Sequence, residues 1–308
     1  MRTINIITSL SAAILLALSC KTETTVSLST KNVYLEVGES VALTASASSG
    51  EAVSFKSQNP EVASVSEEGE VKAVGKGRTT IVAYTADGQA RCSVYIAPKG
   101  AADLGIDLTR DGKQYILYWA KKNVGAASPE AAGNYYAWGE TSTKAHYNWA
   151  TYSLYSGTAE QKAGEWVFDG SFFRYKTGSS YGTADNKTEL EAADDAARKA
   201  LGGAWRIPTE EEWKELGKQC KLDWDEALKC LRVTGPNGNS IVLPPAGYKG
   251  MDGSGAKNVG SYGYYWSATL DSANPVNAIM FFFNSTSTSF SHASSFRSDG
   301  NTVRAVTE

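Results

Sequence analysis

Aromatic residues divide this chain into two unlike parts. All eight Trp and thirteen of the sixteen Tyr lie after residue 114, whereas the preceding part consists largely of short runs of small and β-branched residues. A chain of 308 residues is too long for one compact domain but long enough to bury two separate cores. The sequence therefore predicts two domains of different character.

The first residues have the pattern of an export signal. One positive charge at Arg2 precedes an apolar stretch over residues 4–18, and Cys20 follows shortly after it. The stretch is too short for a membrane-spanning helix and predicts a signal peptide over residues 1–19 with a lipoprotein-type cleavage site. Ala17 stands where such sites usually carry Leu, and an ordinary secreted protein with an incidental Cys20 is the alternative.

Lipidation of Cys20 would anchor the chain to a membrane, with residues 20–24 as the tether. Acyl chains contribute roughly 0.8 kcal/mol per buried methylene group, so several chains hold a protein in place. No Asp follows Cys20 in residues 21–25, which favours the outer over the inner membrane. No later segment is apolar for long enough to span a bilayer. We therefore expect a lipid-anchored outer-membrane protein that is exposed at the cell surface.

Charge and cysteine usage narrow the classes of function. The formal net charge is −3 and no segment is strongly basic, so nucleic acid is not an expected partner. Cys92 lies in an alternating apolar run and is interpreted as a small buried hydrophobic residue. Cys220 and Cys230 are ten residues apart, and this spacing leaves open whether they form a disulfide or remain separate thiols.

Residues 25–97 show short alternating runs separated by turn residues, a pattern typical of a β-sandwich. The expected strands cover residues 33–37, 41–43, 53–55, 62–65, 71–74, 80–84 and 90–96. Turn and strand motifs follow in a set order: Gly38-Glu39-Ser40, Ser57-Gln58-Asn59-Pro60, Val62-Ala63-Ser64-Val65, Gly69 and Val74-Gly75-(x)-Gly77. With this order the module resembles the bacterial Ig-like domain of group 2. The resemblance implies a spacer or stalk.

A turn-prone linker over residues 98–102 is expected to lead into a second domain over residues 103–308. Apolar residues at helical spacing predict one helix over residues 189–201. A second helix is expected after Thr209, which with Glu212 forms a capping box. Further strands are expected over residues 115–119, 231–234, 240–243 and 278–283.

Four motifs stand in order along this second domain. They are Trp119-Ala120-(x)3-Val124-Gly125-Ala126, Tyr136-Ala137-Trp138-Gly139-Glu140-Thr141, Gly202-Gly203-Ala204-Trp205-Arg206-Ile207-Pro208-Thr209 and Gly263-Tyr264-Tyr265-Trp266-Ser267-Ala268. With them, the domain resembles the C-type-lectin-like domains of surface lipoproteins from gut-type Gram-negative bacteria. The expected fold is an all-β Ig-like sandwich followed by an α+β C-type-lectin-like domain. That plan holds long loops on a small scaffold, where ligands bind.

Catalytic and metal chemistry has little support in the sequence. Formylglycine-generating enzymes share this fold but need a pair of cysteines in the C-terminal part, and no cysteine follows Cys230. His146 and His292 have no nearby Cys or His, so their spacing gives neither a metal site nor a nucleophile and base pair. The acidic residues between 189 and 195 are interpreted as a solvated helix face rather than as calcium ligands. We therefore expect no enzyme activity, no metal and no cofactor.

Calcium-bridged sugar binding is not expected either. Calcium-dependent lectins carry Glu-Pro-Asn or Gln-Pro-Asp and Trp-Asn-Asp, whereas this chain has Gly235-Pro236-Asn237 and Asn274-Pro275-Val276. Trp266 is followed by Ser and Ala. Trp205 and Trp266 are interpreted as core residues rather than as platforms for sugar rings.

Residues 270–302 combine Ser, Asn, Asp, Thr, His and Phe with few Lys or Glu, a mixture that adaptable binding surfaces use. The alternative is a surface strand and loop with no special role. The frame Tyr265-Trp266-Ser267-Ala268-Thr269, Phe283-Asn284-Ser285 and Val303-Arg304 around the segment resembles the variable region of target proteins of diversity-generating retroelements. The resemblance implies ligand-binding residues at Asp271, Asn274, Phe282, His292, Ser294, Phe296, Ser298, Asp299 and Asn301.

Together these patterns predict a cell-envelope lipoprotein with a binding head on an Ig-like stalk. The expected partner is a protein or glycan at the cell surface. An enzyme with altered chemistry on the formylglycine-generating fold and a structural envelope component without a specific ligand are the two alternatives.

Overall fold

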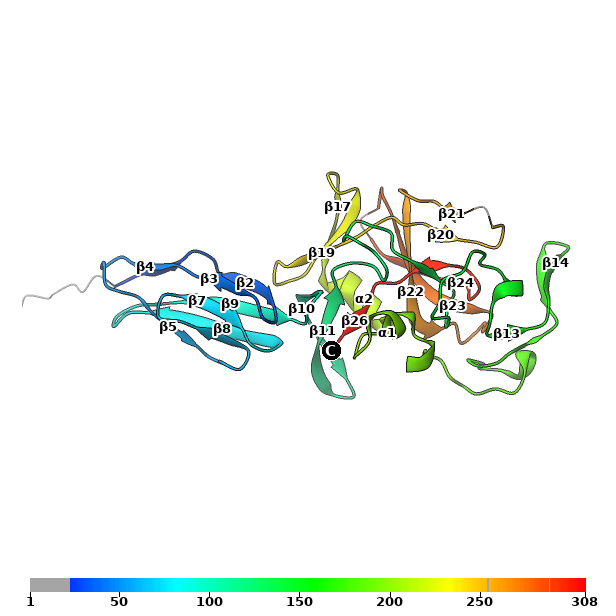
Figure 1. Cartoon of the computed structure of the whole chain (residues 1–308), viewed down its shortest axis with the longest axis horizontal. Helices are drawn as coiled ribbons and strands as arrows, with labels where there is room; N and C mark the ends of the chain where they lie inside the picture. Colours follow the sequence, from blue (N-terminus) through cyan, green and yellow to red (C-terminus); the bar gives the residue numbers. More distant parts are fainter. Residues whose placement is uncertain (1–22, 254, 288) are drawn as a thin grey trace, which may run out of the picture.

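The computed structural model describes residues 23–253, 255–287 and 289–308, so the expected signal peptide and Cys20 lie outside the described residues. The described chain forms an N-terminal β module and a larger C-terminal head, placed end to end along the long axis of the molecule (Figure 1). Strands predominate in both parts. Among the described residues, no helix has the length and apolar character needed to cross a membrane.

The N-terminal module contains two β-sheets and a strand pair. The sheets have the strand orders β2-β9-β8-β5 and β3-β7-β6, and β1 pairs with β4. The bounds are β1 Val26–Leu28, β2 Asn32–Glu36, β3 Ser40–Ala42, β4 Ala45–Ala47, β5 Ser54–Ser57, β6 Ala63–Val65, β7 Glu70–Ala73, β8 Gly77–Tyr84 and β9 Gln89–Ala97. The expected sandwich is present, and β1 and β4 are additions to the strands that the sequence predicts.

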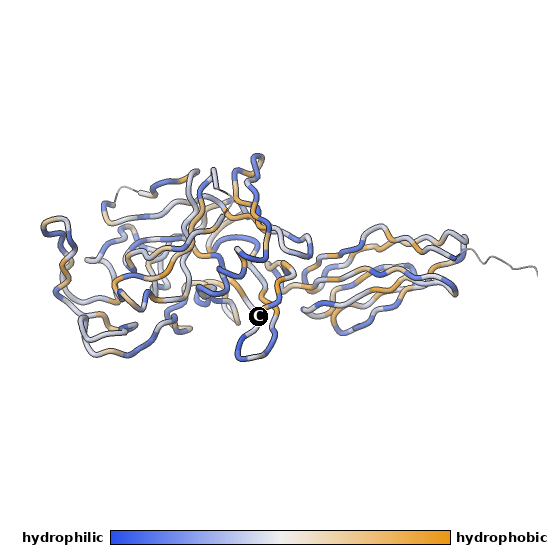
Figure 2. Tube along the Cα trace, turned by 180° about the vertical axis from the view of Figure 1, so that it is seen from behind, coloured by the Kyte–Doolittle hydropathy of each residue, from blue (hydrophilic) through white to orange (hydrophobic). Residues whose placement is uncertain are grey.

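One apolar core lies between these two sheets. Along β9 the side chains of Cys92, Val94 and Ile96 are buried, as the period of two residues in a strand requires. They pack with Val71 of β7 and with Leu43. The same alternation of hydrophobic and hydrophilic residues runs along the module in Figure 2. Cys92 is therefore a small buried hydrophobic residue, and burial raises the pKa of its thiol to about 11.

The module joins the head through a turn of three residues. β9 ends at Ala97, and β10 (Ala101–Arg110) begins directly after residues 98–100. The expected linker over residues 98–102 is therefore too long, because Ala101 and Ala102 are buried and already pair with β11 (Lys113–Ala120).

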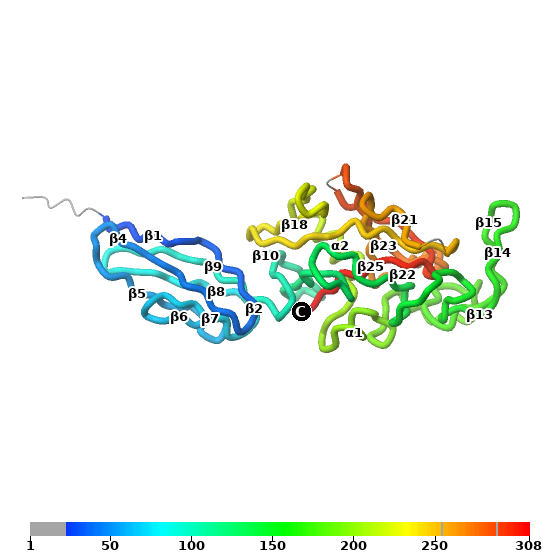
Figure 3. The backbone as a smooth tube through the Cα atoms, turned by 45° about the horizontal axis from the view of Figure 1, so that its top comes forward, coloured from blue at the N-terminus to red at the C-terminus, as the bar shows by residue number. Residues whose placement is uncertain are grey.

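A five-stranded sheet forms the centre of the head, in the order β12-β25-β22-β23-β24. Two three-stranded sheets, β10-β11-β26 and β17-β18-β19, and the pairs β13-β16, β14-β15 and β20-β21 surround it. The β14-β15 hairpin projects from the end of the head that lies farthest from the N-terminal module (Figures 1 and 3). The remaining strand bounds are β12 Tyr135–Tyr136, β13 Tyr155–Ser156, β14 Ala159–Lys162, β15 Glu165–Phe168, β16 Ser171–Phe172, β17 Lys221–Asp225, β18 Cys230–Thr234, β19 Ser240–Leu243, β20 Tyr248–Lys249, β21 Ala256–Lys257, β22 Tyr262–Leu270, β23 Asn277–Asn284, β24 Ser291–Phe296, β25 Asn301–Thr302 and β26 Val306–Thr307.

The central sheet contributes to two apolar cores. On one face Trp213 stacks on Phe281, with ring centroids 5.6 Å apart. On the other, Trp266 and Met280 join an aromatic cluster that includes Trp138. Trp266 is fully buried, as its interpretation as a core residue requires, whereas Trp205 is only partly buried.

Two arginines near the end of the chain are part of the interior. Arg304 is fully buried and donates to the carbonyl oxygens of Ala120 and Val242 and to the side chain of Asn123. Burial in the absence of a carboxylate partner lowers its pKa to about 10. Arg297 is also fully buried, and its guanidinium carbon lies 4.3 Å from the centre of the Phe172 ring. Both side chains therefore stabilise the head from inside.

Of the two helices that the sequence predicts, one is present as expected and the other is present only in its second half. α2 (Glu210–Gln219) begins after Thr209, and the capping box with Glu212 is present, as predicted. The helix expected over residues 189–201 is wrong in its first half, because α1 covers only Ala196–Leu201, after the 3-10 turn η3 (Ala192–Asp194). The preceding residues pair with β22 instead of coiling, and the backbone N–H of Leu190 donates to Ala268 at 2.9 Å. The other 3-10 turns are η1 Trp149–Thr151 and η2 Ser179–Tyr181.

Cys220 and Cys230 are free thiols. They flank opposite ends of the β17-β18 hairpin, because Lys221 pairs with Thr234 and Asp225 pairs with Cys230. The two cysteines are therefore offset by five residues along the hairpin, which is about 16 Å at roughly 3.3 Å per residue. A disulfide needs Cα atoms less than about 7 Å apart, so the pairing that the spacing left open is excluded in this fold.

Candidate functional site

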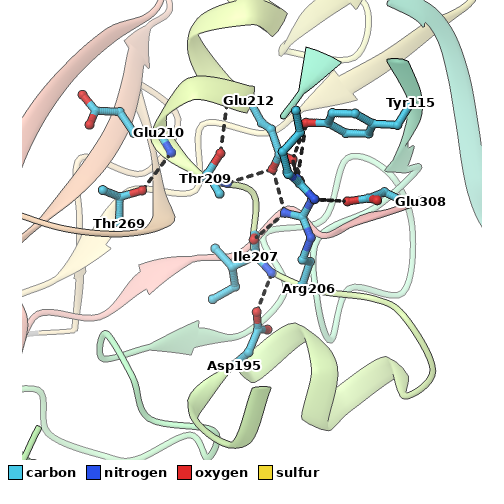
Figure 4. A network of polar contacts seen from close by, with 10 residues as sticks. Tyr115, Asp195, Arg206, Ile207, Thr209, Glu210, Glu212, Thr269 and Glu308 are labelled. Carbon is cyan, nitrogen blue, oxygen red and sulfur yellow. Dashed lines mark hydrogen bonds and ion pairs between the residues drawn. The ribbon is translucent and has the colours of Figure 1, made fainter. Parts of the chain in front are cut away.

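A polar cleft of about 910 Å³ opens between the β10-β11 hairpin, α1 and α2. Its network of polar contacts is drawn in Figure 4. Glu212 of α2 lies at the centre with only 3% of its surface exposed. The volume of this cleft lies in the range of small-molecule sites, so its chemistry bears on whether the head could act as an enzyme.

Every lone pair of the Glu212 carboxylate is already used. Arg206 donates at 2.6 and 2.7 Å, Arg110 at 2.9 Å, Tyr115 at 3.1 Å and the backbone N–H of Thr209 at 2.9 Å. Burial acts to raise the pKa of Glu212, but the hydrogen bonds and charge of Arg206 outweigh it and the pKa is lowered. A carboxylate that is saturated and kept ionised cannot serve as a general acid, and it has no free acceptor for a substrate proton. Its role is to hold α2 against the β10-β11 hairpin.

The acidic cluster expected on a solvated helix face is partly internal, which corrects that interpretation. Asp194 is 8% exposed and accepts hydrogen bonds from Arg174 at 2.6 and 2.8 Å and from the hydroxyl of Tyr175. Asp195 is 3% exposed, caps α1 and accepts the backbone N–H of Ile207 at 2.8 Å. Both carboxylates are therefore structural.

The two histidines are on the surface, unlike the buried carboxylates Glu212, Asp194 and Asp195. His146 and His292 are both exposed, and His292 lies 4.0 Å from Glu210. Within the part of the chain that the structure describes, no group of three or more His, Cys, Asp or Glu side chains could hold a metal ion.

Aromatic side chains gather on the face of the central sheet that points away from α2. Tyr264 of β22 stands opposite Phe282 of β23, and their rings stack with centroids 6.0 Å apart. Tyr262 stacks on Tyr264 at 5.7 Å, and Tyr248 of β20 meets it edge-on at 5.2 Å. All four side chains are half-buried. We call Tyr248, Tyr262, Tyr264 and Phe282 the tyrosine face.

The local sequence explains why these rings meet. In a strand, alternate residues share a face, so Tyr262 and Tyr264 project together. The β20-β21 hairpin then brings Tyr248 against Tyr264, and Asn258, just beyond β21, donates to the Tyr264 hydroxyl at 3.2 Å. Gly247 has a φ of +66°, and a Cβ there would lie 1.9 Å from the carbonyl oxygen of Lys257, so only glycine allows this close approach.

The tyrosine face has the chemistry of an adaptable binding surface. Among the described residues, the hydroxyls of Tyr248 and Tyr262 have no hydrogen-bond partner, so both can bond to a ligand. Lys249 lies beside it with its ammonium 5.1 Å from the centre of the Tyr135 ring. Burial raises the pKa of Tyr264, which keeps its hydroxyl protonated as a donor. Rigid aromatic area with a few polar tips is the composition of antibody binding surfaces.

The nine residues predicted to bind a ligand do not share one face. Phe282 is on the tyrosine face, whereas His292 and Ser294 are exposed on the opposite face of the sheet, where Ser294 donates to Asp271 at 2.6 Å. Asn274 is exposed in the loop between β22 and β23. Phe296 packs against Trp149 and Trp166.

The last three predicted residues are internal, which contradicts their expected place on a surface. Ser298 is fully buried, Asn301 is 1% exposed and Asp299 is 8% exposed. They lie where the chain turns from β24 into β25, a strand held between β12 and β22. Burial raises the pKa of Asp299 to about 7, and the hydrogen bond from Ser295 and the charge of Lys257 offset it only in part.

Sequence reasoning missed Tyr248, Tyr262 and Tyr264. The available signal was the Tyr-Gly-Tyr alternation at 262–264 together with the Gly and Tyr-rich run before it. The contact of Tyr248 with Tyr264 depends on how a hairpin packs on the sheet, which no local pattern encodes.

Comparison with known proteins identifies the N-terminal module. Residues 23–103 match the family model of the bacterial Ig-like domain (group 2). No curated protein matches the chain. A solved structure of an intimin mutant from EHEC O157:H7 is 28% identical over 24% of this chain and 42% of its own length, with a TM-score of 0.19. Domains 5–6 of the S-layer protein SbsC are 17% identical over 46% of this chain and 80% of theirs, with a TM-score of 0.22.

The chain thus spans less than half the length of the intimin structure, and neither superposition carries an argument about the head. The family match covers the N-terminal module and the first residues of β10. The prediction of a group 2 bacterial Ig-like domain in this part of the chain is confirmed.

Proposed function

We propose that this protein is a surface-displayed binding protein whose head contacts a protein or glycan ligand through the tyrosine face. The stacked rings of Tyr262, Tyr264 and Phe282 carry the proposal. They offer half-buried aromatic area on a regular sheet, and the hydroxyls of Tyr262 and of the adjoining Tyr248 are available to bond to a ligand. The saturated Glu212 network in the polar cleft favours binding over catalysis.

We infer further that the head follows a C-type-lectin-like plan and that the Ig-like module is its stalk. Two helices, a mixed set of short strands and long loops support the first inference. The end-to-end arrangement of the two parts supports the second (Figure 1). The export signal and Cys20 support lipid anchoring at the outer membrane, with the head outside the cell.

Ligand binding is tested with the purified full chain on a glycan array and on a panel of extracellular and cell-surface proteins. For any ligand found, Tyr264→Ala should weaken binding by about 2 kcal/mol, roughly a thirtyfold loss, because it removes the central ring of the stack. Tyr248→Ala should weaken binding severalfold, because it leaves the Tyr262 and Tyr264 stack in place.

Tyr84→Ala is the matched control, because Tyr84 is 41% exposed on the N-terminal module, away from the head. It should leave the affinity unchanged. Equal affinity of the Tyr264→Ala and Tyr84→Ala proteins would remove the tyrosine face from ligand binding. Failure of every panel ligand to bind the unaltered chain would favour the structural envelope role.

Anchoring and display have their own test. Cells grown with a labelled fatty acid should incorporate the label into the unaltered chain and not into the Cys20→Ser variant. Protease added to intact cells should then digest the head. A labelled chain that resists protease until the cells are opened would place the head inside the outer membrane.

A further inference from the structure

β24 is an open edge of the central sheet. It is the last strand in the order β12-β25-β22-β23-β24, and among the strands of the described residues its one partner is β23. Within the described part of the chain, the backbone groups of residues 291–295 make no hydrogen bonds outside that pairing. Such an edge is a template for another strand, and proteins usually guard it with Lys, Pro or a bulge. The sequence Ser-His-Ala-Ser-Ser-Phe of β24 contains none of these guards.

A pocket of about 300 Å³ lies directly beside this edge, between β24 and α2. His292 belongs to both the strand and the pocket wall. The floor is apolar, because Trp213 of α2 stacks on Phe281 and meets Phe290 edge-on at 5.7 Å. The volume suits one aromatic or long aliphatic side chain.

The register of the sheet links the pocket to the open edge. His292 pairs with Phe281, and their rings lie 5.8 Å apart on the α2 side of the sheet. Residues directly opposite each other on neighbouring strands project to the same face. A residue of an added strand that pairs with His292 would therefore point its side chain toward the pocket.

A carboxylate stands two residues farther along the same face. Ser294 donates to Asp271 at 2.6 Å, and Asp271 has no ion-pair partner among the described residues. A residue opposite Ser294 would place its side chain near this carboxylate, which accepts hydrogen bonds from Ser294 and from the backbone N–H groups of Ala273 and Asn274. In an antiparallel strand, the residue opposite Ser294 comes two positions before the residue opposite His292.

We propose that β24 and the adjoining pocket form a docking groove for an extended peptide, which adds to the sheet as an antiparallel strand. The peptide inserts one apolar side chain between His292 and α2 and carries a Lys or Arg two residues earlier, close to Asp271. Main-chain hydrogen bonds to the edge supply affinity, and the pocket and the carboxylate supply specificity. This groove is on the opposite side of the sheet from the tyrosine face and does not depend on it.

The probe is the fluorescein-labelled peptide Thr-Val-Lys-Val-Phe-Val-Thr, titrated against the full chain by fluorescence anisotropy. Two further peptides carry N-methyl groups, one on the three Val residues and the other on Thr, Lys and Phe. Methylation along one edge should lower affinity at least tenfold and methylation along the other should not, because an added strand bonds through one edge only. Replacement of Phe by Ser should also lower affinity at least tenfold.

Hydrogen exchange locates the peptide, and a variant tests the charge. The bound probe should slow exchange of the amides in residues 291–295. Asp271→Asn should weaken the Lys peptide severalfold and leave a norleucine analogue unchanged, because the amide keeps its size and loses its charge. The proposal is overturned by absence of binding, by equal affinity of both N-methylated peptides, or by protection on β22 in place of β24.

Discussion

Arg78 and Asp103 form a two-point ion pair that joins the N-terminal module to the head. Arg78 Nε lies 2.7 Å from Asp103 Oδ2, and Nη2 lies 2.8 Å from Oδ1. Asp103 is only 1% exposed. The same guanidinium donates to the carbonyl oxygen of Ile106 at 3.1 Å, so one side chain holds several groups of β10.

Removal of this cation should loosen the junction. Arg78→Ala leaves Asp103 buried without its charge partner, which we expect to cost about 3 kcal/mol of the free energy of unfolding. Urea denaturation measures the loss, and small-angle scattering should show a wider distribution of overall dimensions. Arg232→Ala is the control, because its pair with Asp225 is partly exposed and should contribute under about 1 kcal/mol. Equal stability of the two variants would contradict this role of Arg78.

Loss of the Glu212 carboxylate should destabilise the head strongly. Glu212→Ala removes the capping box of α2 and leaves Arg206 without its bidentate partner, so we expect a loss of at least about 3 kcal/mol in chemical denaturation. Glu211→Ala on the same helix is the control, because the ion pair that Glu211 makes among the described residues is an exposed one with Lys214. A loss below 1 kcal/mol for Glu212→Ala would show that the network is dispensable.

Because of Asp299, the free energy of unfolding should fall as pH rises. Its pKa is about 7 in the folded protein against an ordinary value of 3.8, so the folded state holds the proton more tightly than the unfolded chain. The contribution of the protonated Asp299 carboxyl to the stability of the fold is complete below pH 3.8 and is lost as pH rises through 7. Asp299→Asn should therefore be more stable than the unaltered protein at pH 8, by on the order of 2–4 kcal/mol, and similar to it near pH 4. Denaturation curves at both pH values test this, and a difference that does not change with pH would contradict it.

Thiol counting tests the cysteine assignment. Burial raises the pKa values of Cys92, Cys220 and Cys230 to about 11, 12 and 11, so all three should react slowly with a thiol reagent in the native protein. Three thiols should react after unfolding without reductant. A single reactive thiol would reveal a Cys220 to Cys230 disulfide, and a fourth would show that Cys20 carries no acyl chain.

Burial also sets a limit on sequence diversification. If the retroelement resemblance holds, codons for the exposed Asn274, His292 and Ser294 should vary across a natural population, whereas those for the buried Ser298 and Asn301 should stay constant. Deep sequencing of the 3′ end of the gene measures this. A uniform sequence would mean a fixed specificity, and variation at the two buried codons would contradict the limit.

Local patterns predicted the parts of the fold that local physics determines. The period of two residues identified β9, and the Thr209 and Glu212 capping box identified the start of α2. The failures share one cause, which is contact between distant segments. Leu190 bonds to Ala268 in place of entering a helix, and Asp194 is buried and accepts hydrogen bonds from Arg174. The tyrosine face was missed for the same reason.

The three-residue turn between β9 and β10 has a consequence for how the head meets its surroundings. Because the turn is short and the ion pair of Arg78 with Asp103 joins the two parts, the head has little freedom to rotate relative to the module. The tyrosine face therefore points in a fixed direction relative to the N-terminal module. A partner bound by the head would therefore meet a face whose orientation relative to the N-terminal module is already set, so little rotational freedom between the two parts would be lost on binding.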